Sequence, residues 1–122
     1  NADYWTISEG EITVHPKYLE PKRQIYNYDF FEGISYTINV SKESGQRIEE
    51  LMFDGKAISD TDTFKIVVNN YRSSGGGDYH MLKKGRILKE YTEEIIEVMY
   101  AYLKETDLNI LPIQENNVKL TK

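Results

Sequence analysis

The segment Ile34–Val40 constrains the fold more than any other part of this 122-residue chain. Its sequence, ISYTINV, places apolar and polar side chains at strictly alternating positions. A period of two is typical of a β-strand that turns one face to the core and the other to solvent. The sequence therefore predicts a sheet, with this strand contributing to its buried side.

Further strands are predicted on both sides of this one, over Glu11–Val14, Arg47–Phe53 and Thr63–Asn69. The dipeptide Asp54–Gly55 follows the second of them and favours a tight hairpin turn, because both central residues of such a turn need a positive φ. The apolar run Ile66–Val68 does not alternate, which indicates a strand buried on both faces.

The helical signals lie later in the chain. Asp78–Lys83 is predicted to form one helical turn, and a longer helix is predicted to begin at an N-cap Thr92 and to end near Lys104. A last short strand is expected within Ile110–Leu120. The predicted fold class is α+β, with a mixed, largely antiparallel sheet and one main C-terminal helix.

Composition excludes several functions. The length predicts one domain, and the net charge of −5 without a basic stripe argues against binding a nucleic acid duplex. No apolar run approaches the roughly 20 residues of a membrane span. Cysteine is absent, and the only histidines, His15 and His80, lie far apart in the sequence. A cysteine-based metal site is therefore excluded, and two distant histidines give little support to any other metal site. Composition alone leaves a Ser-His-Asp triad open, but no nucleophile-elbow motif occurs, so we expect no catalytic residue and no metal ligand within this chain.

The segment after the third predicted strand has a composition that suits a ligand. Glycine permits close approach of backbone to a bound molecule, an exposed tyrosine offers a stacking face, and arginine and asparagine offer hydrogen bonds. Together these residue types fit a nucleoside. The candidate substrate-binding residues are Asn69, Asn70, Tyr71, Arg72, Gly75, Gly76, Gly77 and Asp78.

An alternative explanation of this segment has similar weight on chemistry alone. The glycines would form a flexible linker between strand and helix, and Tyr71 would pack in the core. Asn69, Asn70 and Arg72 are expected either to make polar contacts or to support the loop. Asp78 likewise has two interpretations, a contact to ribose or a cap for the next helical turn.

Four motifs occur in order along the chain: Tyr28–Val40, Gly45–Ile48, Asp54–Lys56 and Asn69–Gly77. In this order and spacing they resemble the C-terminal domain of the 5′-nucleotidase family. Within that family the chain most resembles the bacterial 2′,3′-cyclic-nucleotide 2′-phosphodiesterase/3′-nucleotidase branch.

The resemblance implies that residues 3–122 are the later portion of a substrate-binding domain, and residues 1–2 look like the remnant of an expression tag. In the parent enzyme, an N-terminal metallophosphoesterase domain would hold a pair of divalent metal ions and hydrolyse 2′,3′-cyclic nucleotides and nucleoside monophosphates. This fragment alone would have no cofactor and no activity. The parent would be secreted or attached to a bacterial cell wall, and a cut sheet edge is a possible route to self-association.

The resemblance also implies roles for individual residues. An aromatic residue at the position of Tyr71 forms one side of a sandwich around the base. Many 5′-nucleotidases have a ribose-binding Asp where this chain has Gly77, and here Asp78 is displaced by one residue. The competing interpretation of the whole chain is a non-catalytic interaction or adhesion module without nucleotide affinity.

Overall fold

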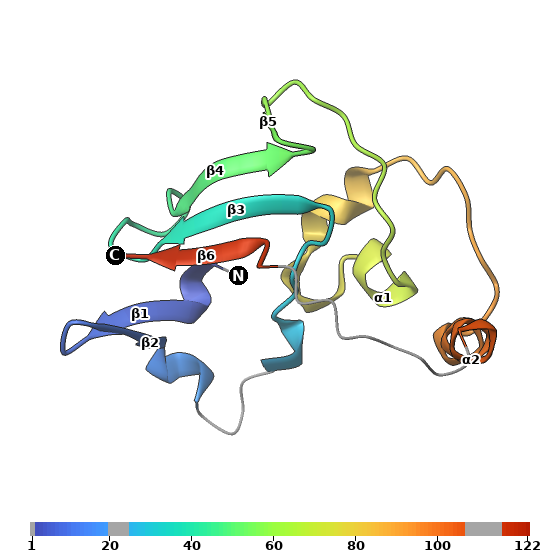
Figure 1. The fold of residues 1–122 in the computed structure, drawn as a ribbon, viewed down its shortest axis with the longest axis horizontal. Coiled ribbons are helices and arrows are strands. Elements are labelled where there is room, and N and C mark those ends of the chain that lie inside the picture. The colour runs from blue at the N-terminus through green and yellow to red at the C-terminus, as the bar shows by residue number, and fades with distance from the viewer. Residues whose placement is uncertain (1, 20–24, 107–115) are drawn as a thin grey trace. The chain divides into compact units, whose positions relative to one another are not determined.

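The computed structural model describes residues 2–19, 25–106 and 116–122 (Figure 1). These residues divide into two compact units, which we describe separately. The first holds the described residues up to Lys65 together with Asn116–Lys122. The second holds the described residues from Ile66 to Thr106.

The first unit is built on a four-stranded sheet with the order β5-β4-β3-β6. The strands are β3 (Ile34–Asn39), β4 (Ile48–Phe53), β5 (Lys56–Ala57) and β6 (Val118–Thr121). β3 pairs antiparallel with β4, and β4 pairs antiparallel with β5. β6 is parallel to β3. The predicted mixed, largely antiparallel sheet is therefore confirmed.

The Asp54–Gly55 turn joins β4 to β5 as predicted. Both residues have a positive φ, 49° for Asp54 and 71° for Gly55. The same conformation occurs at Glu9 and Gly10, with φ of 51° and 80°, in the turn between β1 (Trp5–Ser8) and β2 (Glu11–Val14). β2 was predicted and β1 was not, although Glu9–Gly10 is a turn of the same kind.

The core of the first unit lies on one face of β3. Tyr36, Ile38 and Val40 are buried, and Ile38 is the most deeply buried of them at 1% exposure. Trp5 and Ile12 of the β1–β2 hairpin pack against this cluster. The alternation in ISYTINV thus predicted the core side of this strand correctly. The opposite face is not fully open to solvent, because Thr37 is 5% exposed and its hydroxyl donates to the Glu50 carboxylate at 2.8 Å.

Tyr4 and Trp5 join an aromatic cluster rather than standing free. The Trp5 indole N–H donates to the Tyr28 hydroxyl at 3.0 Å, and the centroids of the Tyr4 and Tyr28 rings lie 4.5 Å apart. Short 3-10 helices surround the cluster: η1 (Ala2–Tyr4), η2 (Pro16–Tyr18) and η3 (Ile25–Asn27). Tyr26 lies in η3, and the aromatic residues that follow it up to Phe31 lie outside any strand.

One exposed ion pair predicts a measurable pH dependence. The Lys42 ammonium hydrogen-bonds to the Glu49 carboxylate, and the Asn39 amide donates to it at 3.3 Å. These contacts, that of Lys42 first, lower the pKa of Glu49 below its ordinary value. Because the folded-state pKa is depressed, the pair stabilises the fold above the ordinary glutamate pKa, and the stabilisation is lost as pH falls through the lowered value.

We expect Glu49→Gln to reduce the loss of stability on acidification, by a small amount that disappears in high salt. The measurement is the free energy of unfolding against pH for both proteins. Glu43→Gln, in the neighbouring loop, is the matched control. An unchanged pH profile in Glu49→Gln would contradict the stabilising role of this pair.

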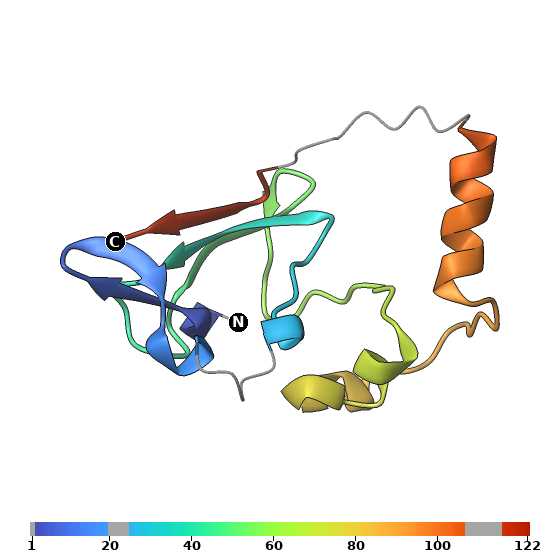
Figure 2. The same cartoon turned by 90° about the horizontal axis from the view of Figure 1, so that it is seen from below.

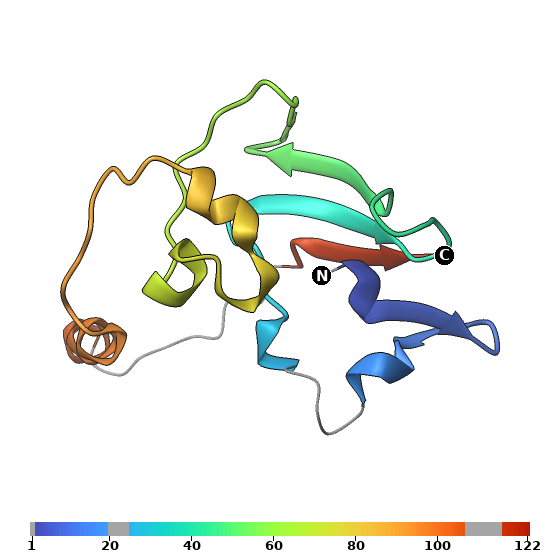
Figure 3. The same cartoon turned by 180° about the vertical axis from the view of Figure 1, so that it is seen from behind.

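The second unit contains short turns and one longer helix. Figure 3 shows α1 (Asn70–Ser73), η4 (Gly76–Asp78) and η5 (His80–Lys84) next to one another. Figure 2 shows α2 (Ile95–Glu105) as a single straight helix. The predicted helical turn over Asp78–Lys83 corresponds to η5. No helix in the described ranges is long and apolar enough to cross a membrane.

The predicted strand Thr63–Asn69 is wrong. These residues form no strand, and the middle residue of the apolar run, Val67, is 96% exposed. A strand requires a hydrogen-bonded neighbour, and β5, the last strand before this segment, has only two residues. The β-branched run carries strand propensity, but propensity supplies no pairing partner.

The long helix begins two residues later than predicted. Glu94, not Thr92, occupies the N-cap position, and the Glu94 backbone N–H donates to the Glu97 carboxylate at 3.3 Å. This capping box needs a carboxylate three residues after the cap, which Glu94 has and Thr92 does not. Most of the expected strand within Ile110–Leu120 lies outside the described residues, and β6 begins at Val118.

Candidate functional site

The candidate site begins at Asn69, which starts α1. The Asn69 side-chain oxygen accepts a hydrogen bond from the Arg72 backbone N–H at 2.8 Å, as an N-cap residue does. The side-chain carbonyl of Asn69 is thus engaged within the protein, which favours loop support over ligand contact. Asn70 is exposed at the first position of the helix.

Arg72 is buried, with 7% of its surface exposed. One guanidinium nitrogen donates to the Gly76 carbonyl oxygen at 3.2 Å. The guanidinium carbon lies 4.5 Å from the centroid of the Tyr79 ring and 5.3 Å from that of Tyr71. Such distances are typical of cation–π contacts. Arg72 therefore joins α1 to the glycine turn and to two aromatic rings.

Tyr71 lies over the glycine turn. A Cβ atom placed on Gly76 would be only 2.4 Å from the Tyr71 Cε2 atom, so the ring occupies the space that a side chain at residue 76 would need. Tyr71 nevertheless remains 47% exposed. Tyr71 is therefore not a core residue, which contradicts the alternative in which this loop is a linker above a packed tyrosine.

The turn itself needs residues that tolerate a positive φ. Gly75 and Gly77 have φ of 83° and 66°, and Asp78 has φ of 69°. Asp is one of the few non-glycine residues that adopt this conformation readily. Gly76 is not in that region, so its small size serves the Tyr71 ring and not the backbone.

Asp78 does not cap the next helical turn. Tyr79 occupies the N-cap position of η5, with no side-chain cap hydrogen bond. The Asp78 side chain is 99% exposed, and its carboxylate lies 3.8 Å from His80 Nε2. The carboxylate is thus available to a ligand.

The two histidines lie in different units. His15 Nδ1 accepts a hydrogen bond from the Lys17 backbone N–H at 3.2 Å, which explains it as a local cap. His80 is exposed beside Asp78. Among the described residues, no group of three or more His, Cys, Asp or Glu side chains is placed to hold a metal ion.

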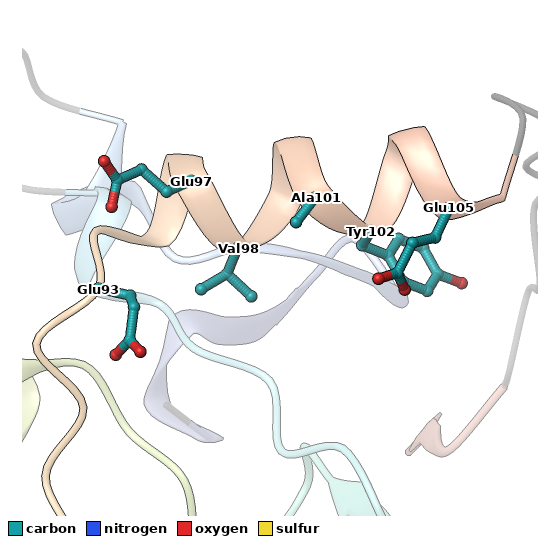
Figure 4. Close-up of a pocket in the computed structure, with 6 residues that line it drawn as sticks. All are labelled: Glu93, Glu97, Val98, Ala101, Tyr102 and Glu105. Atoms are coloured by element: carbon teal, nitrogen blue, oxygen red, sulfur yellow. The ribbon is translucent and has the colours of Figure 1, made fainter.

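A second surface feature lies on α2. Figure 4 shows a shallow depression whose lining side chains come from this helix and from Glu93, which precedes it. Acidic side chains border an apolar strip, and no residue of the helix is buried. The lining residues are Glu93, Glu97, Val98, Ala101, Tyr102 and Glu105.

The structure thus brings all the predicted site residues into one short region of the second unit. It adds two residues that sequence reasoning missed, Tyr79 against Arg72 and Lys83 against Gly75. Their contacts depend on the left-handed glycine conformations, and the only sequence signal for these was the run of three glycines.

The family model for the 5′-nucleotidase C-terminal domain matches residues 8–84, which is more than half of the chain. The chain belongs to this family. The match includes strands β2, β3, β4 and β5 and the whole candidate site.

Relatives of this 5′-nucleotidase C-terminal domain are nucleotide phosphoesterases by name. The chain is 34% identical over 104 residues to the trifunctional nucleotide phosphoesterase protein YfkN of Bacillus subtilis, covering 75% of the chain and 7% of that protein. It is 36% identical over 115 residues to a 2′,3′-cyclic-nucleotide 2′-phosphodiesterase/3′-nucleotidase of Yersinia enterocolitica, covering 78% of the chain and 17% of that protein. The chain therefore spans a small part of these relatives.

A solved structure agrees with the fold. A Staphylococcus aureus protein described as a 5′-nucleotidase, crystallised in complex with alpha-ketoglutarate, superposes with a TM-score of 0.87 at 36% sequence identity. The similarity covers 99% of this chain and 24% of that one. The predicted fold class and family are confirmed.

Proposed function

We propose that this chain is the nucleoside-binding portion of a bacterial nucleotide phosphoesterase that acts on 2′,3′-cyclic nucleotides and nucleoside monophosphates. The observation that carries the proposal is the half-exposed Tyr71 ring. This ring lies on Gly76 of the glycine turn and beside the Arg72 guanidinium. A fixed, accessible aromatic ring is suited to stacking on a base. The exposed Asp78 carboxylate supplies an acceptor for ribose hydroxyls.

In this proposal the chemistry belongs to another part of a longer protein. A metallophosphoesterase domain would hold two divalent metal ions and hydrolyse the ester, and this portion would position the nucleoside. The names of the relatives and the small share of their length that the chain spans support this division. We place the parent outside the bacterial cell or at its wall, and cell fractionation tests that location.

The test is an amide NMR titration of this chain with adenosine and with 3′-AMP up to millimolar concentration. We expect shifts within Asn69–Tyr79. Tyr71→Ala should weaken binding roughly fivefold or more, because one base stack contributes about 1–3 kcal/mol. Tyr71→Phe should bind like the wild type, since it keeps the ring.

The control is Tyr91→Ala, which removes another exposed tyrosine of the same unit. It should leave the titration unchanged. If Tyr71→Ala and the wild type gave the same affinity, the role of Tyr71 would be wrong.

A second candidate function rests on α2. This helix exposes a set of large apolar side chains, Ile95, Ile96, Val98, Met99, Tyr100 and Tyr102, which suits a protein interaction or adhesion surface. In that case the chain would be a module without nucleotide affinity. Ligand-induced shifts within Asn69–Tyr79 would contradict this candidate. Self-association through the sheet edges, which are β5 and β6, stays a prediction.

A further inference from the structure

The Lys83 side chain crosses the backbone of Gly75. A Cβ atom added to Gly75 would lie 2.7 Å from Lys83 Cε and 3.2 Å from both Cδ and Cγ. Gly75 is itself buried. The aliphatic part of Lys83 therefore covers this side of the turn along most of its length, in space that only glycine leaves open.

The ammonium group at the end of this side chain is available. Lys83 as a whole is exposed, and within the described part of the chain its ammonium has no ion pair and no hydrogen bond. A lysine that packs its stem and leaves its charge in solvent is well known, and here the stem fixes where the charge lies. The ammonium has three hydrogens to donate and accepts none.

Lys83 and Tyr71 cover consecutive residues of one turn. The lysine lies across Gly75 and the tyrosine ring lies on Gly76. Since consecutive Cα atoms are about 3.8 Å apart, a flat ring stacked on Tyr71 would have its edge within reach of the lysine. The two side chains thus place a stacking face and a hydrogen-bond donor at consecutive residues of one turn.

We propose that Lys83 determines base specificity by donating a hydrogen bond to a ring carbonyl oxygen of the base that stacks on Tyr71. This inference rests on the proposed nucleoside site. A 6-oxopurine or a 4-oxopyrimidine presents an acceptor at that edge, whereas adenine and cytosine present an amino group there. The ammonium repels that amino group, so the site favours hypoxanthine, guanine and uracil.

The test compares inosine with adenosine, which have the same sugar and the same purine frame. Their dissociation constants are measured by NMR titration for the wild type, Lys83→Met and Lys83→Arg. We expect the wild type to bind inosine about three- to tenfold more tightly, which is less than a hydrogen bond to a charged group usually contributes, because the ammonium is exposed. Lys83→Met keeps an unbranched stem across Gly75 and should bring the ratio close to one. Lys83→Arg should keep the preference.

Lys84→Met is the matched control, since it removes the same charge from the next residue. Its inosine preference should equal that of the wild type. If the preference were absent in the wild type or persisted in Lys83→Met, the proposal would be overturned. A larger effect of Lys83→Met on 3′-AMP than on adenosine, with the inosine preference intact, would assign the ammonium to phosphate and would also overturn it.

Failure of this proposal is distinguishable from failure of the nucleoside site. If Tyr71→Ala weakens both nucleosides while Lys83→Met leaves their ratio unchanged, only the role of Lys83 is wrong. If Tyr71→Ala has no effect, or if neither nucleoside shifts any amide in the wild type, the nucleoside site in this chain is wrong and the role of Lys83 fails with it.

Discussion

An Arg72→Met variant is expected to lose about 2–4 kcal/mol of local stability in the glycine turn. The guanidinium donates to the Gly76 carbonyl and lies against the Tyr71 and Tyr79 rings, and methionine replaces neither the hydrogen bond nor the charge. Because Arg72 is buried, the Gly76 carbonyl loses a donor where water replaces it poorly. The turn should open more often, and Tyr71 should lose its fixed position.

Hydrogen exchange measures this loss directly. The Ser73, Ser74 and Gly75 amides are hydrogen-bonded to Asn69, Asn70 and Arg72 carbonyls and report on the turn. They should exchange roughly thirty- to a thousandfold faster in Arg72→Met, which is the same free energy at about 1.4 kcal/mol per factor of ten. Amides of β3 should be unaffected, because they belong to the other unit.

Two variants make this result specific. Arg72→Lys should recover only part of the protection, since an ammonium cannot match the planar fork that meets a carbonyl and two rings together. Arg86→Met removes an exposed arginine of the same unit and should change nothing. Unaltered exchange in Arg72→Met would mean that the buried guanidinium does not support the turn.

The part of the fold that could be predicted depends on local chemistry. Alternation identified β3 and its buried face, and Asp54–Gly55 identified a turn whose conformation follows from its own two residues. Thr63–Asn69 shows the limit of this reasoning. Its β-branched residues fit a strand, but whether a strand forms depends on a neighbour elsewhere in the chain, which the local pattern does not contain.

The candidate site shows the same division. Tyr71 and the glycines were evident from residue type, because stacking faces and unhindered backbone are properties of single residues. For Asn69 and Arg72 the sequence left polar contact and loop support as alternatives, since a cap and a buried guanidinium are defined by their partners. Lys83 was missed for the same reason: the path of its side chain depends on the left-handed Gly75, which brings residues eight positions apart into contact.

Gly76→Ala is expected to weaken nucleoside binding by about as much as Tyr71→Ala, roughly fivefold or more. The added methyl group would lie 2.4–2.6 Å from three atoms of the Tyr71 ring, closer than nonbonded carbon atoms approach, so the ring must leave its place. The substitution isolates this contact, because Gly76 does not have the positive φ that would add backbone strain at Gly75 or Gly77.

Titration with adenosine checks this prediction, and Gly85→Ala provides the control. Gly85 has a φ of −70°, and its added Cβ would meet only the Leu82 carbonyl oxygen at 3.3 Å, so that variant should bind like the wild type. The double variant Gly76→Ala/Tyr71→Ala should bind no more weakly than Tyr71→Ala alone, because the methyl group acts only by displacing a ring that is then absent. If the two losses were additive instead, Gly76 would also contribute to binding through its own backbone, and not only by leaving space for the Tyr71 ring.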